Sequence, residues 1–150
     1  MIEVQDFRPE HLERFTPRPW DVEAYAGQRW DEIQKVILDS QKHGPAWVAI
    51  DEDGKVLCIT GVVVLWPGVA EGWGFFSDGA FKRPKEILGH YRRWIQAVME
   101  TWELWRLQVM ACCSLYGADR WAKAMGFQFE GCMRKWGAAG EDYSRFALVR

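Results

Sequence analysis

The sequence predicts an α/β (α+β) fold in which a single mixed, mostly antiparallel sheet of about six to seven strands carries helices on both faces. Three strand candidates follow one another between residues 46 and 77 with only short turns between them, which indicates an antiparallel series. Amphipathic helices then alternate with the remaining strands, which indicates that these helices pack on the same sheet. A chain of 150 residues can bury one hydrophobic core, so we expect one domain over residues 1–150.

The first third begins with a short strand and then becomes helical. Glu3–Phe7 alternates as a strand does, and Pro9–Leu12 opens a brief helical turn that two prolines interrupt. From Asp21 to about His43 the pattern is that of one helix, which Gly44-Pro45 ends. The apolar face of this helix comprises Trp30, Ile33, Val36 and Ile37.

The middle of the chain reads as three strands. Ala46–Ile50 is the first, and Asp51–Gly54 has the composition of a hairpin turn. Lys55–Trp66 is long and rich in β-branched residues, which favour strands. Pro67-Gly68 ends it, and Ala70–Ser77 is the third strand of this series.

The helix from Pro84 to about Thr101 has the clearest hydrophobic period in the chain. Lys82, Arg83 and Lys85 surround its start, although the N-terminus of a helix favours negative charge. A bound anion would explain this inversion, and a solvated basic cluster is the alternative. The apolar stripe consists of Ile87, Leu88, Tyr91, Trp94, Ile95, Val98, Met99 and Trp102, of which we expect Ile87, Leu88, Tyr91, Ile95 and Val98 to face the sheet.

The last third reads as a strand, a short helix and two further strands. Leu104–Cys113 is the strand, and Tyr143–Arg150 is the last one. The helix carries one apolar face, and Gly126 lies where a helix C-cap favours a left-handed residue. Phe127 and Phe129 then alternate toward Gly131. The residues of the apolar helix face are Ala118, Trp121, Ala122 and Met125.

This order of strand, helix, Gly126-Phe127 and strand resembles the C-terminal half of the GNAT acyltransferase superfamily, and the element order of the whole chain is similar to the GNAT order. The resemblance implies that the sheet splays between its fourth and fifth strands and holds acyl-coenzyme A there, with acetyl-CoA as the expected cofactor. The glycine-rich phosphate loop of the family is replaced by Asp78–Lys85, so the basic residues would have to contact phosphate directly. The implied cofactor-binding residues are Phe75, Phe76, Ser77, Lys82, Arg83, Lys85 and Trp121.

The resemblance also implies a set of catalytic residues, which this chain carries only in part. The family commonly uses a carboxylate on the fourth strand as general base, and Glu71 lies there; a solvated turn residue is the alternative. The Asn and Tyr that active members often carry are replaced by Leu115 and Ala122, which cannot transfer protons. Tyr116 is the candidate to protonate the departing thiolate, and a packing role is the alternative.

The composition excludes several classes of partner. The net charge of −2 and the isoelectric point near 5.9 argue against nucleic acid. The longest apolar run, around Val62–Leu65, is too short to cross a bilayer, and the N-terminus has no secretion signal, so we expect no membrane partner and a cytoplasmic protein. The four cysteines and three histidines lack metal-ligand spacing, so we expect no metal site and reduced thiols.

Ten tryptophans are more than a domain of this size readily buries. Tryptophan is enriched at interfaces as well as in cores, because its ring is apolar and its indole N–H is a donor. We therefore expect at least two of them to be exposed, in a homodimer contact or along the cleft.

Two functions follow from these observations. The first is an acyl-CoA-dependent N-acyltransferase that transfers an acyl group, expected to be acetyl, to an amine of unknown identity. The second is a catalytically silent GNAT-fold protein whose tryptophan-rich surface binds a protein partner. Within the superfamily the chain looks most like small uncharacterised proteins of short-tailed bacteriophages, through Trp73–Asp78 and Leu104-Trp105 among other segments, which implies the host cytoplasm or the virion as its location.

Overall fold

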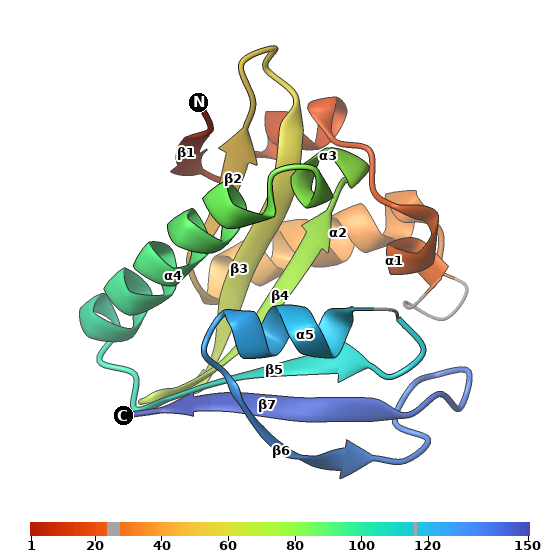
Figure 1. The fold of residues 1–150 in the computed structure, drawn as a ribbon, viewed down its shortest axis with the longest axis vertical. Helices are drawn as coiled ribbons and strands as arrows, with labels where there is room; N and C mark the ends of the chain where they lie inside the picture. Colours follow the sequence, from red (N-terminus) through yellow and green to blue (C-terminus); the bar gives the residue numbers. More distant parts are fainter. Residues whose placement is uncertain (24–27, 116) are drawn as a thin grey trace.

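The computed structural model describes residues 1–23, 28–115 and 117–150, and its centre is a seven-stranded sheet. The strand order is β1-β2-β3-β4-β5-β7-β6, and the strands curve into an open, twisted sheet (Figure 1). All neighbours pair antiparallel except β4 and β5, which are parallel. The predicted mixed, mostly antiparallel sheet is therefore confirmed. The strands are β1 Glu3–Asp6, β2 Ala46–Ile50, β3 Val56–Trp66, β4 Val69–Phe76, β5 Arg106–Cys112, β6 Gln128–Met133 and β7 Tyr143–Val149.

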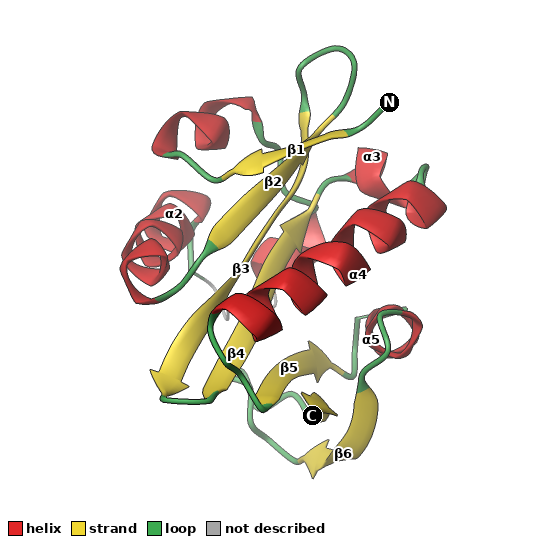
Figure 2. Cartoon of the chain, turned by 90° about the vertical axis from the view of Figure 1, so that its left-hand side faces the viewer, coloured by secondary structure: helices red, strands yellow, loops and turns green. Residues whose placement is uncertain are grey.

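Helices cover both faces of this sheet, as Figure 2 shows for α2 and α4. The first face carries α3 (Asp78–Phe81), α4 (Pro84–Thr101) and α5 (Ala118–Ala124). The second face is covered by α2 (Trp30–Ser40), with α1 (Pro19–Glu23) beside it. Two short 3-10 helices, η1 (Pro9–Arg14) and η2 (Gln41–His43), are also present among the described residues.

Each face has its own hydrophobic core. Ile87, Tyr91 and Ile95 of α4 pack with Trp47 and Leu107 on the first face. On the second face, Ile33 and Ile37 of α2 pack with Val48, Ile59 and Phe75. Strand β2 is buried along its whole length, because its successive side chains enter different cores. Burying each of these large side chains contributes roughly 1.5–3 kcal/mol to stability.

The helix predicted from Asp21 to about His43 is wrong as one continuous element. Arg29 has the extended angles φ −79° and ψ 156°, and α2 begins only at the next residue. The Arg29 N–H donates to the Glu32 carboxylate at 3.1 Å, so the second helix has a cap of its own. Val36, assigned to the apolar face, is 46% exposed.

The helix Pro84–Thr101 is confirmed with the predicted bounds. Four of its five residues expected to face the sheet, namely Ile87, Tyr91, Ile95 and Val98, are buried, and Leu88 is half-buried against the same core. The end of α5 is also as predicted, because Gly126 has φ +96°. Its N–H donates to Lys123 and the Phe127 N–H donates to Ala122, the two bonds of a Schellman cap.

The prediction of at least two exposed tryptophans is confirmed. Trp66, Trp102, Trp105 and Trp136 each expose about half of their surface. All four cysteines are free thiols.

Candidate active site

The site begins where β4 and β5 separate. Their parallel register covers three pairs and ends at Glu71 opposite Gln108. Beyond that point β4 stays paired with β3 as far as Phe76, and β5 stays paired with β7 as far as Cys112. The two strands therefore diverge toward their C-terminal ends, as the spread between the β4 and β5 arrows in Figure 1 shows. A cavity of about 490 Å³ fills this opening, and the predicted splay is confirmed.

Both faces of the sheet contribute walls to this cleft, because the gap passes between the strands. Alternation along β4 places Gly72, Gly74 and Phe76 toward α4 and α5, and it places Glu71, Trp73 and Phe75 toward α2. All six line the cavity. On the α4 side the wall is completed by Tyr91 and by Trp121, Ala122 and Met125.

Neighbouring side chains already occupy the places where Cβ atoms on two glycines of β4 would lie. A Cβ on Gly72 would lie 2.9 Å from the Val109 side chain, and one on Gly74 would lie 3.0 Å from the Thr60 side chain. Real Cβ atoms essentially never approach closer than 3.0 Å, so larger residues would push into this narrow space. The edge of β4 thus presents bare backbone to the cavity over these residues.

Aromatic rings gather around the glycines. Trp121 lies edge-on to Phe76 at 5.4 Å between centroids and 5.7 Å from Phe81. Trp73 and Trp121 are the two indoles of this wall whose buried N–H groups have no partner among the described residues. Buried indole N–H groups usually find an acceptor, so the cleft offers two donors to a ligand, one from each face.

Glu71 lies at the apex of the cleft and ends a chain of polar contacts. Gln108 donates its Nε2–H to Glu71 Oε2 at 3.4 Å. The Gln108 oxygen in turn accepts from Arg106 Nε at 3.1 Å. Arg106 is held by Glu130 through two contacts, one of 2.9 Å, and this Arg106 pairing lowers the pKa of Glu130. Because Arg106 fixes the amide oxygen, the amide nitrogen of Gln108 must face Glu71.

A second ion pair stands at the other end of β4. Arg18 contacts both carboxylate oxygens of Asp21, at 3.1 and 2.8 Å, and both side chains are largely buried. The Asp21 carboxylate also accepts the backbone N–H of Phe76 at 3.4 Å, which satisfies one amide on the outer edge of β4. The Arg18 guanidinium lies 4.0 Å from the Phe81 ring centroid, in the range of a cation–π contact.

The sequence matches no protein-family model. It also matches no curated protein. Solved structures, however, superpose on the whole chain. Ribosomal-protein-S5-alanine acetyltransferase from Vibrio fischeri does so with a TM-score of 0.75 at 14% identity, over 99% of this chain and 92% of the other. A mutant of spermidine N-acetyltransferase from Vibrio cholerae gives 0.71 at 10% identity, over 98% and 94%.

A GNAT superfamily phosphinothricin acetyltransferase from Sinorhizobium meliloti, solved with acetyl-CoA bound, gives a TM-score of 0.70 at 14% identity, over 99% of this chain and 88% of the other. The chain has the GNAT fold. The neighbours establish this fold alone, because their identities are low.

Three of the predicted cofactor residues, Phe75, Phe76 and Trp121, line the cleft between β4 and β5. Phe76 and Trp121 lie on the α4 side, whereas Phe75 packs on the opposite face against Trp30 at 5.8 Å. Ser77 lies just beyond the cleft, where it precedes α3 and its backbone pairs with Leu57 and Ala80.

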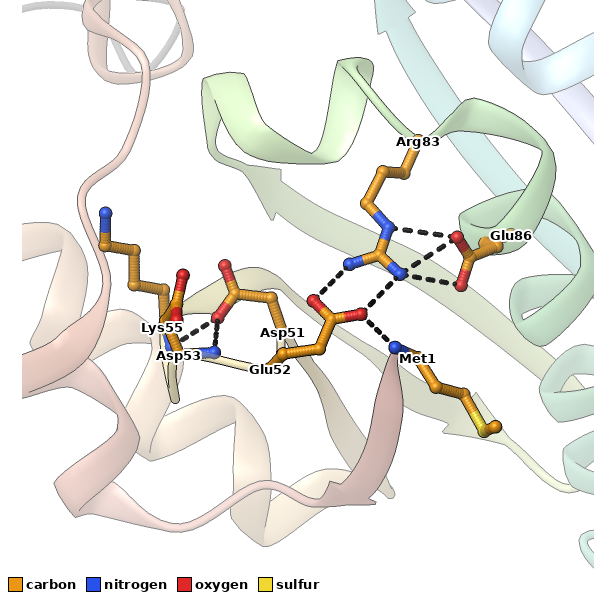
Figure 3. A network of polar contacts seen from close by, with 7 residues as sticks. All are labelled: Met1, Asp51, Glu52, Asp53, Lys55, Arg83 and Glu86. Carbon is orange, nitrogen blue, oxygen red and sulfur yellow. Dashed lines mark hydrogen bonds and ion pairs between the residues drawn. The ribbon is translucent and has the colours of Figure 1, made fainter.

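The three basic residues at the start of α4 do not line the cleft. Arg83 binds Glu52 at 2.7 and 2.9 Å and Glu86 at 3.0 Å, and the N-terminal amine also contacts Glu52 (Figure 3). The Arg83 guanidinium, followed by the N-terminal amine, lowers the pKa of Glu52 to about 2. The Arg83 guanidinium is therefore already paired with two carboxylates of the protein itself, while Lys82 and Lys85 are exposed. Phosphate contacts by these three residues stay a prediction.

The predicted catalytic residues have different positions. Glu71 lies in the cleft, as described above. Tyr116 lies outside the residues that the structure describes, so its role stays a prediction. Leu115 and Ala122 both line the cavity, so apolar side chains stand where the family often has Asn and Tyr.

Sequence reasoning missed Gln108, Arg18 and Asp21. Gln108 could have been noticed as the polar residue within the apolar run Leu107–Cys112. Arg18 and Asp21 gave no comparable signal, because their place in the cleft depends on how α1 packs. Across the described ranges, no group of three or more His, Cys, Asp or Glu side chains is arranged to hold a metal, and no helix is long and apolar enough to span a membrane.

Proposed function

We propose that the protein is an acyl-CoA-dependent N-acyltransferase, with acetyl as the acyl group and an amine as acceptor. The observation that carries this proposal is the cleft of about 490 Å³ between two parallel strands that separate after three pairs. A fold neighbour solved with acetyl-CoA supports the choice of cofactor. The bacteriophage origin and the homodimer stay predictions.

The α4 side of the cleft fits the thioester end of the cofactor. Gly72 and Gly74 line the cleft without side chains, so a chain of atoms could run along the bare backbone of β4 there. The unpaired Trp121 N–H is available to an acceptor oxygen on that side. Phe76, Tyr91 and Trp121 would exclude water from the reacting end.

The amine enters from the α2 side, where Glu71 lies. When bound, acetyl-CoA supplies the acyl group as a thioester. Glu71 takes the proton that the amine loses as its nitrogen forms the new bond to the acyl carbon. Gln108 holds the carboxylate in place from behind, with Arg106 and Glu130 supporting it. Tyr116 remains the candidate to donate a proton to the departing thiolate.

Calorimetric titration with acetyl-CoA and with coenzyme A tests the proposal. We expect saturable one-to-one binding by the native chain. Gly72→Ala should weaken it, because the new methyl group enters the cleft against Val109. Gly89→Ala on α4 is the matched control, since a Cβ there meets only the Arg93 side chain at 3.7 Å. No binding at millimolar cofactor would refute the proposal and favour a silent scaffold.

A further inference from the structure

A second cavity lies on the α2 side of the sheet. It measures about 280 Å³ and lies between α2 and the β3–β4 hairpin. Seven of the described residues that line it are apolar, and Ile33, Ile37 and Phe75 form its buried base. Val36 and Leu65 stand on its rim with 46% and 39% of their surfaces exposed.

This second cavity continues the main cleft. Glu71, Gly72, Trp73 and Phe75 belong to the walls of both. Glu71 therefore stands where the two spaces meet, and it is the only charged side chain among the described residues that line the second cavity. The other polar side chain there is Ser40, whose hydroxyl already donates to the Val36 carbonyl at 2.8 Å.

Gly61 shapes the shared wall. Its missing Cβ would lie 2.6 Å from the six-membered ring of Trp73, so the absence of a side chain lets the indole lie close against β3. The indole thus separates the two cavities without filling the second one. An ammonium group beside Glu71 would also lie near this ring, which attracts cations through its face.

We propose that the second cavity holds the apolar body of the acceptor, so that the substrate class is an amphipathic monoamine with its amino group at Glu71. This inference rests on the proposed function. The volume suffices, because a cavity of about 150 Å³ already holds benzene. A polyamine fits poorly, since each further ammonium needs its own carboxylate and the described wall offers none beyond Glu71.

The test compares 2-phenylethylamine with spermidine as acceptors, following release of free thiol from acetyl-CoA. We expect kcat/KM for 2-phenylethylamine to exceed that for spermidine at least tenfold. The double variant Val36→Gln/Leu65→Gln makes the rim polar and should raise the KM for 2-phenylethylamine at least fivefold, with the affinity for acetyl-CoA unchanged. Val4→Gln/Val149→Gln is the matched control, because these exposed valines line neither cavity.

Equal or better use of spermidine, or an unchanged KM in the rim variant, would overturn the inference while leaving the proposed function intact. Failure of the proposed function can be told apart from failure of the inference, because 2-phenylethylamine can be titrated calorimetrically without cofactor. If the protein does not bind acetyl-CoA, the proposed function fails; amine binding that the rim variant loses would still support the apolar subsite. If 2-phenylethylamine does not bind to the native chain in that titration, the apolar subsite is refuted.

Discussion

Replacing Glu71 with glutamine tests the acid–base chemistry most directly. The substitution keeps the shape of the side chain and removes its charge. Glu71→Gln retains an oxygen that can accept the 3.4 Å hydrogen bond from Gln108, so we expect the free energy of unfolding to change by less than about 1 kcal/mol. Acetyl-CoA should bind as before, because the carboxylate faces the α2 side of the cleft.

The expected loss is in turnover. General-base catalysis contributes about 10²–10⁴-fold to rate. At about 1.36 kcal/mol for each factor of ten, Glu71→Gln should raise the activation barrier by about 2.7–5.4 kcal/mol. The hydrogen bond that orients the carboxylate is long, so we expect a value toward the lower end. Release of free thiol with a saturating amine measures kcat, and calorimetry measures cofactor affinity in the same preparation.

The control is Glu3→Gln, which makes the same change at an exposed carboxylate that also accepts an amide hydrogen bond, from Gln5 at 2.8 Å. That variant should retain full activity. The reasoning would be refuted if Glu71→Gln kept kcat within about threefold of the native value while binding acetyl-CoA normally. The proton would then leave the amine by another path, and Glu71 would have only a binding role.

Three further predictions concern charge and backbone. Because Arg83 is the largest cause that lowers the pKa of Glu52 to about 2 from an ordinary value near 4.5, the stabilisation from this pair should be complete above pH 4.5 and be lost as the pH falls toward 2; in Arg83→Ala, NMR titration of Glu52 should show a higher midpoint that stays below the ordinary value, because the N-terminal amine still contacts the carboxylate. Gly126→Ala forces a Cβ into a residue with φ +96° and should lower the free energy of unfolding by about 1–2 kcal/mol in urea denaturation, whereas an unchanged midpoint would mean that the cap relaxes. Lys82→Ala/Lys85→Ala should weaken coenzyme A binding severalfold at low salt and less at high salt, and a salt-independent effect would argue against phosphate contacts.

Most secondary structure was predictable because it depends on local period and local turn chemistry. The apolar stripe of α4 and the proline at its first turn sufficed to define both of its ends. The break between α1 and α2 was not predictable in the same way. Trp30, Ile33 and Ile37 keep a helical period, and nothing in that period reveals that Arg29 is extended.

The site was predictable only in outline. The splay and Glu71 follow from the resemblance of the chain to a known fold, and Phe76 and Trp121 do line the cleft. The ion pairs could not be predicted from the sequence, because each one joins two residues that are distant in sequence. Arg83 meets Glu52 across 31 positions, and Arg106 meets Glu130 across 24. Such pairs are formed by tertiary packing, which a single sequence does not encode in any local pattern.

The three-pair junction between β4 and β5 also has a mechanical meaning. The sheet consists of two blocks. The first contains β1, β2, β3 and β4, and the second contains β5, β7 and β6; antiparallel ladders longer than three pairs hold each block together. Beyond Glu71 and Gln108 no ladder bond joins the blocks, so they can rotate apart about this junction without breaking one. The junction ends at Glu71, so a rotation that widened the cleft to admit or release ligands would move Glu71 less than the far ends of β4 and β5.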